Sequence, residues 1–188
     1  MLNWLRHCDR ELFLFINSHH NLTFDWIMYH VSLTLTWVPL YLCILYYIFK
    51  KYPKTTVWYV VLTIVLSVGL SNFISSELLK TTVHRLRPSH VPELQQYIHL
   101  VRNYSGGKFG FASSHAANMT AIAVCTSYFL TKKWITISMC VWALFVSYSR
   151  IYLGVHYPGD VLGGIFIGFG VSVTVIYFYN LKFKNRNS

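Results

Sequence analysis

Three short stretches of this chain carry side chains that could perform chemistry together: Lys80 with Arg87, the run Ser113-Ser114-His115, and Arg150 with His156 and Asp160. A pocket rich in cations suits a phosphate group, whose oxygens arginine grips in a bidentate manner. Two histidines suit nucleophilic attack and acid–base catalysis near neutral pH. A carboxylate four residues after a histidine suits orienting the imidazole. These residue types therefore favour phosphoryl transfer to a histidine and then to water.

Long charge-free stretches separate the three motifs. Of the 188 residues, 54% are hydrophobic and only 12% are charged, about half of the roughly 25% typical of soluble domains. A helix that crosses a bilayer needs about 20 mostly apolar residues. Five stretches without Asp, Glu, Lys or Arg meet or approach that length: Trp26–Phe49, Thr55–Ser76, Ala116–Thr131, Trp134–Ser149 and Val161–Leu181. The composition predicts an integral membrane protein and excludes a soluble enzyme, a disordered tail and a DNA-binding module.

The predicted fold class is all-α: a polytopic membrane helix bundle with five transmembrane helices, forming a single domain over residues 1–188. The two stretches of 16 residues reach span length only if they extend outward, to Ser113 and to Ile151. That extension places His115 and Arg150 at the outer edge of the membrane. All three motifs then meet on one surface, where ionisable residues at membrane depth indicate function and helix N-termini attract anions.

Two further segments lie outside the predicted spans. Residues 1–20 place leucine and phenylalanine among charges, which predicts an amphipathic helix in the membrane interface; a short sixth span is the alternative. Residues 80–112 form the only long connection, rich in Pro, His, Gly and Tyr, and loops of this length are functional or disordered. We expect this loop to face outward and to contact the substrate.

The net charge of +10 is a topology signal rather than a sign of a nucleic-acid partner. With five spans, the loops of one side collect eight basic residues and no acidic one: Lys50, Lys51, Lys54, Lys132, Lys133, Lys182, Lys184 and Arg186. Cytoplasmic loops carry the Lys/Arg excess. We therefore expect a multi-pass protein of the cytoplasmic (inner) membrane whose motifs face the periplasm or the cell exterior.

The motifs resemble those of the type 2 phosphatidic acid phosphatase family, PAP2. The segment Lys80-Thr-Thr-Val-His-Arg-Leu-Arg87-Pro88 matches the K-x6-R-P signature, and Ala112-Ser113-Ser114-His115 is similar to the P-S-G-H element. The segment from Ser149-Arg150 through His156 to Asp160 matches S-R-x5-H-x3-D in full. The departures are Ala112 for the family's Pro and Ser114 for its Gly, and neither removes a catalytic group.

The resemblance implies a role for each matched residue. His156 would be the nucleophile that forms a phosphohistidine, Asp160 would hold its other ring nitrogen, and His115 would protonate the leaving oxygen and later activate water. The phosphate-binding residues would be Lys80, Arg87, Ser113, Ser114 and Arg150. No cofactor and no metal is expected, because these cations supply the charge that a metal supplies elsewhere.

The activity implied is that of a metal-independent lipid phosphatase or diphosphatase acting on a headgroup at the outer leaflet, with a lipid phosphate and the membrane as partners. Undecaprenyl diphosphate is the preferred substrate; phosphatidate, phosphatidylglycerol phosphate and lipid A phosphates are the alternatives. A non-catalytic lipid-phosphate binding or transport protein is the alternative class, and a structural or regulatory membrane subunit is a third. The family's soluble vanadium haloperoxidases do not fit a chain with five spans. The sequence indicates no oligomeric state.

The remaining polar residues carry simpler interpretations. Arg85 is expected to be a solvated loop charge, with an indirect contact to the site as the alternative. We expect interfacial or loop positions for the other seven histidines: His7, His19, His20, His30, His84, His90 and His99. Asp9, Glu11 and Asp25 are too far from the other acidic residues in sequence to predict a metal site.

Overall fold

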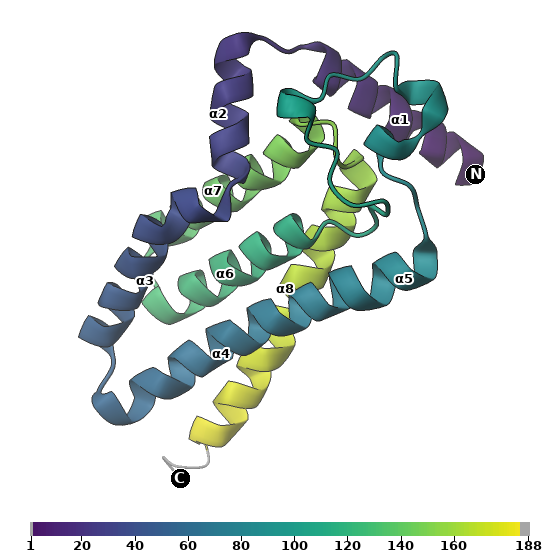
Figure 1. Cartoon of the computed structure of the whole chain (residues 1–188). Coiled ribbons are helices and arrows are strands. Elements are labelled where there is room, and N and C mark those ends of the chain that lie inside the picture. Colours follow the sequence, from purple (N-terminus) through teal and green to yellow (C-terminus); the bar gives the residue numbers. More distant parts are fainter. Residues whose placement is uncertain (1, 185–188) are drawn as a thin grey trace.

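The computed structural model describes residues 2–184, and these residues form helices and loops without a β-strand. Helices α4, α6, α7 and α8 run through the body of the molecule, and α1 lies across one end beside the long loop (Figure 1). The elements are α1 (Leu2–Ser18), α2 (Leu22–Ser32), η1 (Thr34–Trp37), α3 (Val38–Lys51), α4 (Lys54–Asn72), η2 (Phe73–Leu78), α5 (Leu79–Val83), η3 (Pro88–His90), η4 (Pro92–Leu94), η5 (Val101–Asn103), α6 (Ser114–Leu130), α7 (Lys133–Tyr152) and α8 (Pro158–Lys184). The predicted all-helical class is confirmed.

The count of five spans is not confirmed. Three continuous helices are long and apolar enough to cross a membrane: Lys54–Val83, Lys133–Tyr152 and Pro158–Phe183. A fourth span exists if the bent pair Leu22–Ser32 and Thr34–Lys51 crosses as one unit. Helix α6 has 17 residues, the lower limit of the usual range of about 17–25, and is not among them. The described residues thus support three to four spans.

The predicted span Trp26–Phe49 is not one continuous helix. The chain bends by 72° between α2 and η1, where Leu33 is extended with φ −76° and ψ 125°. Side chains satisfy the carbonyls freed by the break: Thr36 Oγ1 donates to the His30 carbonyl at 2.7 Å, and Trp37 Nε1 donates to the Val31 carbonyl at 2.8 Å. Pro39, in the first turn of α3, has no N–H to continue the helix from the preceding turn. The absence of charged residues predicted a long apolar segment, but it carries no information about where the helix bends.

The second predicted span continues beyond its charge-free stretch. From α4 the helix passes through the π-helical turn η2 into α5, and His84, in the left-handed conformation with φ 51°, ends it. Such π-turns are frequent at functional sites. Lys80 therefore lies on the last turns of a long helix rather than in a loop.

Helix α6 forms the centre of the bundle and contacts α4, α7 and α8. Close approach to α8 requires glycine: a Cβ on Gly164 would lie 2.3 Å from the Ser113 carbonyl oxygen, and one on Gly168 would lie 2.2 Å from that of Ala117. Helix packing without hydrophobic driving force relies on such small residues. This contact fixes the start of α6, with Ser113 and His115, beside the start of α8, with Asp160.

The basic turns gather at the opposite end of the molecule from the long loop (Figure 1). Lys51 Nζ donates to the Phe129 carbonyl and to Thr131 Oγ1, both at 2.8 Å, so the α3–α4 turn lies against the α6–α7 turn. The C-terminal end of α8 lies at this end as well. Arg186, the last of the eight basic residues, lies outside the described part of the chain.

Helix α1 packs against the rest of the protein with one of its faces. Phe13 and Asn17 are fully buried, and the Phe13 ring contacts the Tyr157 ring edge-on at 5.4 Å. The opposite face exposes large apolar side chains, including Trp4, Leu5, Leu12 and Phe15, which suits a helix at the headgroup boundary. The interfacial position of α1 stays a prediction, with a short sixth span as its alternative.

Candidate active site

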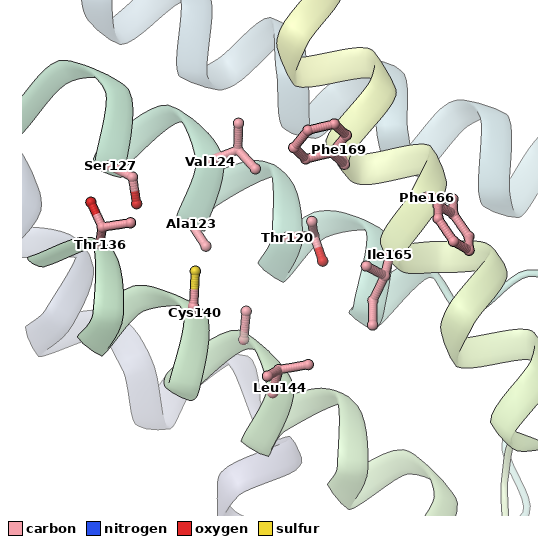
Figure 2. Close-up of a pocket in the computed structure, with 11 residues that line it drawn as sticks. Thr120, Ala123, Val124, Ser127, Thr136, Cys140, Leu144, Ile165, Phe166 and Phe169 are labelled. Atoms are coloured by element: carbon pink, nitrogen blue, oxygen red, sulfur yellow. The ribbon is translucent and has the colours of Figure 1, made fainter. Parts of the chain in front are cut away.

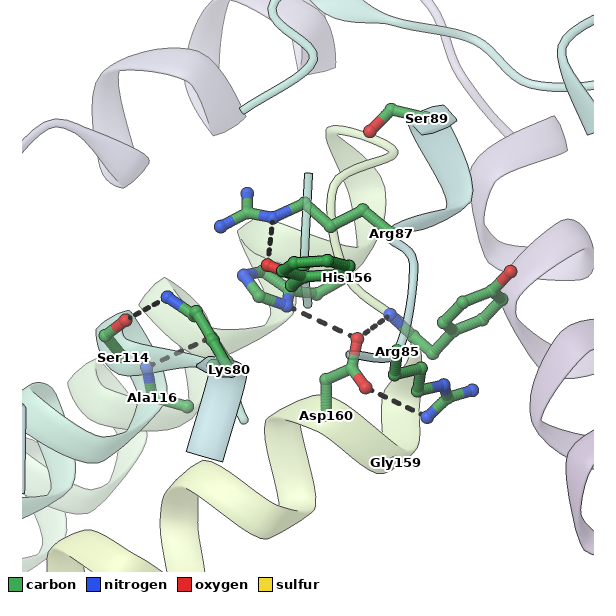
Figure 3. A network of polar contacts seen from close by, with 12 residues as sticks. Lys80, Arg85, Arg87, Ser89, Ser114, Ala116, His156, Gly159 and Asp160 are labelled. Atoms are coloured by element: carbon green, nitrogen blue, oxygen red, sulfur yellow. Dashed lines mark hydrogen bonds and ion pairs between the residues drawn. The ribbon is translucent and has the colours of Figure 1, made fainter. Parts of the chain in front are cut away.

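The start of α6 meets the end of the long α4–α5 helix through one lysine. Lys80 Nζ donates to Ser114 Oγ at 2.7 Å and to Ser76 Oγ at 3.4 Å, and the two hydroxyls are 2.8 Å apart. Ser113 caps α6 by accepting from the Ala116 N–H at 3.4 Å. The Ser113 oxygen accepts this bond, so its O–H remains a donor for the expected contact with phosphate. Figure 3 shows Lys80 and Ser114 facing the rest of the polar cluster.

Arg87 is fixed by a short antiparallel pairing within the long loop. Its N–H donates to the Lys108 carbonyl and its Nε to the Phe109 carbonyl, both at 3.1 Å. Gly110 closes the pairing by donating to the Arg85 carbonyl at 2.8 Å, and a Cβ there would lie 2.8 Å from Asp160 Oδ2. Among the described residues, buried Nη1 of Arg87 has no hydrogen-bond partner. Arg87 is therefore held in place by these backbone contacts while its Nη1 is available to donate to an anion.

Arg150 lines a small pocket at the same end of the bundle as the long loop (Figure 1). Its side chain is 2% exposed; it donates from Nη1 to Ser32 Oγ and from Nη2 to the Tyr104 hydroxyl at 3.3 Å. Buried Nε has no partner in the described part of the chain. The pocket, of about 170 Å³, is lined by Tyr29, Ser32, Leu33, Thr34, Tyr104, His115, Arg150 and Leu153. The bend between α2 and η1 therefore forms one wall, and irregular backbone at membrane depth occurs where it lines a cavity.

His156 and Asp160 form the predicted pair across the start of α8. His156 Nδ1 lies 3.4 Å from Asp160 Oδ2, which also accepts from the Tyr157 N–H at 3.1 Å. Both side chains are buried, with 1% and 0% exposed. In Figure 3 the imidazole lies between Arg87 and Asp160. The contact with Asp160 occupies one ring nitrogen and leaves Nε2 toward the cations.

The electrostatic surroundings keep the His156 ring neutral. Burial, and then the charges of Arg87, Arg150 and Lys80, hold the pKa of His156 well below its ordinary value of 6.5. The same three cations and His156 act electrostatically on His115. A neutral imidazole surrounded by cations is the form that can attack an electrophilic phosphorus.

The structure thus brings all eight predicted site residues to one end of the bundle. It also adds Asp9, which the sequence interpretation missed, and Arg85, for which it gave an indirect contact to the site only as the alternative. Arg85 is not a solvated loop charge: Nη1 pairs with Asp160 Oδ1 at 2.9 Å, and Nη2 pairs with Asp9 Oδ2 at 2.6 Å. Asp9 Oδ1 accepts from the Gly159 N–H at 2.7 Å. The K-x6-R-P signature contains Arg85 without marking it, and no motif points to Asp9.

A second pocket, between α6, α7 and α8, has a different character (Figure 2). It measures about 550 Å³ and its walls are apolar, with Thr120, Cys140, Phe166 and Phe169 among the lining residues. Its lining holds no histidine, carboxylate or cation. Such a space suits hydrocarbon rather than catalysis.

Comparison with known proteins agrees with this geometry. Residues 56–184 match the family model described as PAP2 superfamily. The chain belongs to the PAP2 superfamily. Each of the three motifs lies within that match, whereas Asp9 lies before it.

Several curated relatives of this PAP2 protein are lipid phosphatases by name. It is 36% identical over 189 residues to a lipid A 4'-phosphatase of Bacteroides thetaiotaomicron, covering 99% of this chain and 83% of the relative. A lipid A 4'-phosphatase of Porphyromonas gingivalis is 34% identical over 95% of this chain and 76% of its own length. An undecaprenyl-diphosphatase of Sulfolobus acidocaldarius is 29% identical, covering 86% and 74%.

Solved structures extend the likeness to the fold. A transmembrane PAP2 type phosphatidylglycerolphosphate phosphatase from Bacillus subtilis superposes with a TM-score of 0.73, at 24% identity, over 95% of this chain and 87% of that one. The PAP2 protein described here is a membrane lipid phosphatase. The substrate expected from the family resemblance was undecaprenyl diphosphate. These relatives do not confirm that expectation.

Proposed function

We propose that this lipid phosphatase removes the 4'-phosphate from lipid A. The observation that carries the proposal is the extent of the first likeness: 36% identity over 99% of the chain. That stretch includes the bend at Leu33 and the long loop, which contribute Leu33 and Tyr104 to the lining of the pocket and can select a headgroup. The catalytic motifs alone cannot select one, because lipid phosphatases with different substrates share them.

The proposed reaction assigns the two histidines the roles that the PAP2 motifs imply. His156 Nε2 attacks phosphorus, and the bond from phosphorus to the sugar oxygen breaks while His115, protonated in the complex with the phosphate anion, donates its proton to that oxygen and becomes neutral. His115 then takes a proton from water, which attacks the phosphohistidine and releases inorganic phosphate and neutral His156. Asp160 holds Nδ1 of His156 throughout and stabilises the positive charge of the intermediate.

The cations stabilise the phosphoryl group in the transition state. Arg87 Nη1 and Arg150 Nε are buried donors without partners among the described residues, and Lys80 completes the ring. Ser113, Ser114 and the N–H groups at the start of α6 supply further donors. Fixed donors in a site shielded from water stabilise developing negative charge strongly. Three cations perform the work that Mg²⁺ performs in other phosphatases, so the chemistry needs no metal.

The membrane supplies affinity for the rest of the substrate. His115 and Arg150 lie within one turn of helix ends, at the depth of lipid headgroups, so acyl chains remain in the bilayer while the phosphate enters. Each methylene kept out of water contributes about 0.8 kcal/mol. The apolar pocket between α6, α7 and α8 begins at Thr120, about one and a half turns along α6 from His115, which is acyl-chain depth.

A substrate panel tests the proposal. Protein purified in detergent with EDTA is given bisphosphorylated lipid A, lipid A lacking the 4'-phosphate, undecaprenyl diphosphate, phosphatidylglycerol phosphate and phosphatidate, with His156→Ala as the blank. We expect the highest kcat/KM for bisphosphorylated lipid A, and mass spectrometry should show loss of the 4'-phosphate only. A higher kcat/KM for undecaprenyl diphosphate would assign that substrate instead. Binding of lipid A without release of phosphate from any member of the panel would indicate the lipid-phosphate binding class.

A further inference from the structure

Three side chains that the phosphatase mechanism does not use converge on the outer side of the molecule. His20 lies in the link between α1 and α2, Asp25 lies in the first turn of α2, and His99 belongs to the long loop. One ligand atom from each lies within 4.8 Å of the other two. His99 Nε2 is 2.8 Å from Asp25 Oδ2, and the rings of His20 and His99 stack with centroids 3.7 Å apart and planes at 5°.

The surroundings hold these ligand atoms in place. The buried Tyr152 hydroxyl donates to Asp25 Oδ1 at 2.8 Å, which fixes the carboxylate and leaves Oδ2 toward the histidines. The backbone of His99 is fixed on both sides by buried Asn17: its N–H donates to Asn17 Oδ1 at 2.7 Å, and its carbonyl accepts from Asn17 Nδ2 at 2.9 Å. Outer hydrogen bonds of this kind orient the ligands of metal sites.

The chemistry of the donor set selects a class of ligand. Two imidazoles and one carboxylate, with one side open to water, are the protein ligands of many three-ligand zinc sites. Ligand atoms around a tetrahedral zinc ion lie about 3.3 Å apart, given bonds of about 2.0–2.1 Å. The three atoms here reach that arrangement by a tilt of the exposed His20 ring and replacement of the His99–Asp25 hydrogen bond by the ion. Imidazole donors favour zinc over the oxygen-seeking Mg²⁺ and Ca²⁺.

We propose that His20, Asp25 and His99 bind a zinc ion that fastens the α1–α2 link to the long outer loop. The ion would join segments 79 residues apart in sequence, from His20 to His99. Beside it, Val101 packs in a buried cluster with Met28 and Tyr152, and the Arg102 guanidinium lies 4.1 Å over the Tyr29 ring. The ion would take no part in the phosphatase reaction, because none of its three ligands lines the catalytic pocket.

Zinc binding by the purified protein tests the site. The full chain carries a tag without histidine, is stripped with EDTA and is dialysed before titration with ZnSO₄ by calorimetry, with thermal unfolding measured in parallel. We expect one zinc per chain and a higher Tm, since a ligand that binds only the folded state stabilises it. His20→Ala and His99→Ala should each weaken binding more than about 100-fold and remove the shift in Tm. Tyr152→Phe should weaken it about 10–100-fold, the usual effect of losing an outer hydrogen bond.

His19→Ala provides the matched control, because His19 is exposed and adjacent to His20, and its Nδ1 bonds only the local Phe15 carbonyl and Ser18 hydroxyl. This variant should bind zinc with wild-type affinity. His20 is exposed, so His20→Ala should remain monodisperse in size-exclusion chromatography and report binding rather than folding. Wild-type affinity in His20→Ala and His99→Ala, or an equal loss in His19→Ala, overturns the proposal. The readout is binding, so it is independent of which lipid the enzyme hydrolyses.

Discussion

Two arginines that are almost fully enclosed define the chemistry at the scale of single residues. Arg87 and Arg150 are 7% and 2% exposed, and neither forms an ion pair among the described residues. Burying a cation without a partner lowers the free energy of unfolding, and this one cluster contains two such cations. The arrangement is expected of a site whose missing partner is an anion.

Removal of the nucleophile should stop turnover. His156→Ala should lower kcat by about 10⁴-fold or more, the scale on which loss of a covalent nucleophile acts. Rapid alkaline quenching of the wild type with ³²P-labelled substrate should trap a phosphoenzyme, which His156→Ala should lack. His7→Ala, an exposed histidine on α1, serves as control and should keep wild-type turnover. A labelled His156→Ala protein would show that another residue carries the phosphoryl group.

The pKa of His156 sets the acid side of the pH profile. Because burial and the cations lower this pKa below 6.5, the ring stays neutral and nucleophilic as the pH falls through 6.5. The decrease in kcat/KM that results from protonation of His156, the acid limb of the pH profile, should therefore occur below pH 6.5. Arg87→Met removes the largest of the three cationic contributions, so the pKa should rise and the limb should move to higher pH.

Arg87→Lys is the control, because it keeps the positive charge. Its acid limb should stay near that of the wild type even though phosphate binding weakens. The same substrate is used for all three proteins, so its own ionisation contributes equally. Superimposable limbs for Arg87→Met and Arg87→Lys would show that charge at this position does not tune His156.

At the scale of elements, α1 is part of the catalytic end rather than only a membrane anchor. Asp9 reaches from α1 to Arg85 and to the Gly159 N–H, and Arg85 reaches on to Asp160. The Arg85 guanidinium also lies 4.2 Å over the Tyr157 ring. Through this chain of contacts, the position of α1 determines how firmly Asp160 holds His156.

Asp9→Asn should therefore lower kcat with little change in KM. Loss of one charge-assisted hydrogen bond is worth about 1.5 kcal/mol, or roughly a tenfold decrease in kcat, and Asp9 itself does not touch the phosphate. Glu11→Gln removes an acid from an exposed position two residues further along α1 and should leave kcat unchanged. A rise in KM alone, or a lower Tm with unchanged kcat, would assign Asp9 a role other than positioning Asp160.

At the scale of the whole molecule, the two ends differ in charge and in chemistry. The basic α3–α4 and α6–α7 turns meet at one end through Lys51, and the catalytic cluster lies at the other (Figure 1). Positive residues mark the cytoplasmic side of membrane proteins. The catalytic end is thus expected to face the periplasm or the cell exterior.

Labelling of intact cells measures this orientation. In a background with all four cysteines replaced by alanine, Gln95→Cys places a thiol in the long loop and Lys132→Cys places one at the basic end. A membrane-impermeant maleimide should label Gln95→Cys in intact cells and Lys132→Cys only after lysis. The reverse pattern would place the catalytic end in the cytoplasm.

The sequence by itself determined the membrane class and the gathering of the eight predicted site residues at one end of the bundle, because both rest on local composition or spacing; their roles and the side of the membrane that they face stay predictions. Charge-free stretches indicate burial in lipid. His156 precedes α8 and Asp160 lies in its first turn, so their closeness in sequence keeps the two side chains close in space. Motif order was enough to place Lys80 and Arg87 with them.

Only the tertiary structure decided what depends on contacts between distant segments. The bend at Leu33 forms because Thr36, Trp37 and Pro39 together satisfy or remove the hydrogen bonds of one turn, which apolarity does not reveal. Asp9 joins the catalytic end through residues 76 and 150 positions away, and His20 meets His99 across the long loop. Such pairs leave no periodic or spaced signal in the chain, because their proximity is set by how α1 packs on the finished bundle.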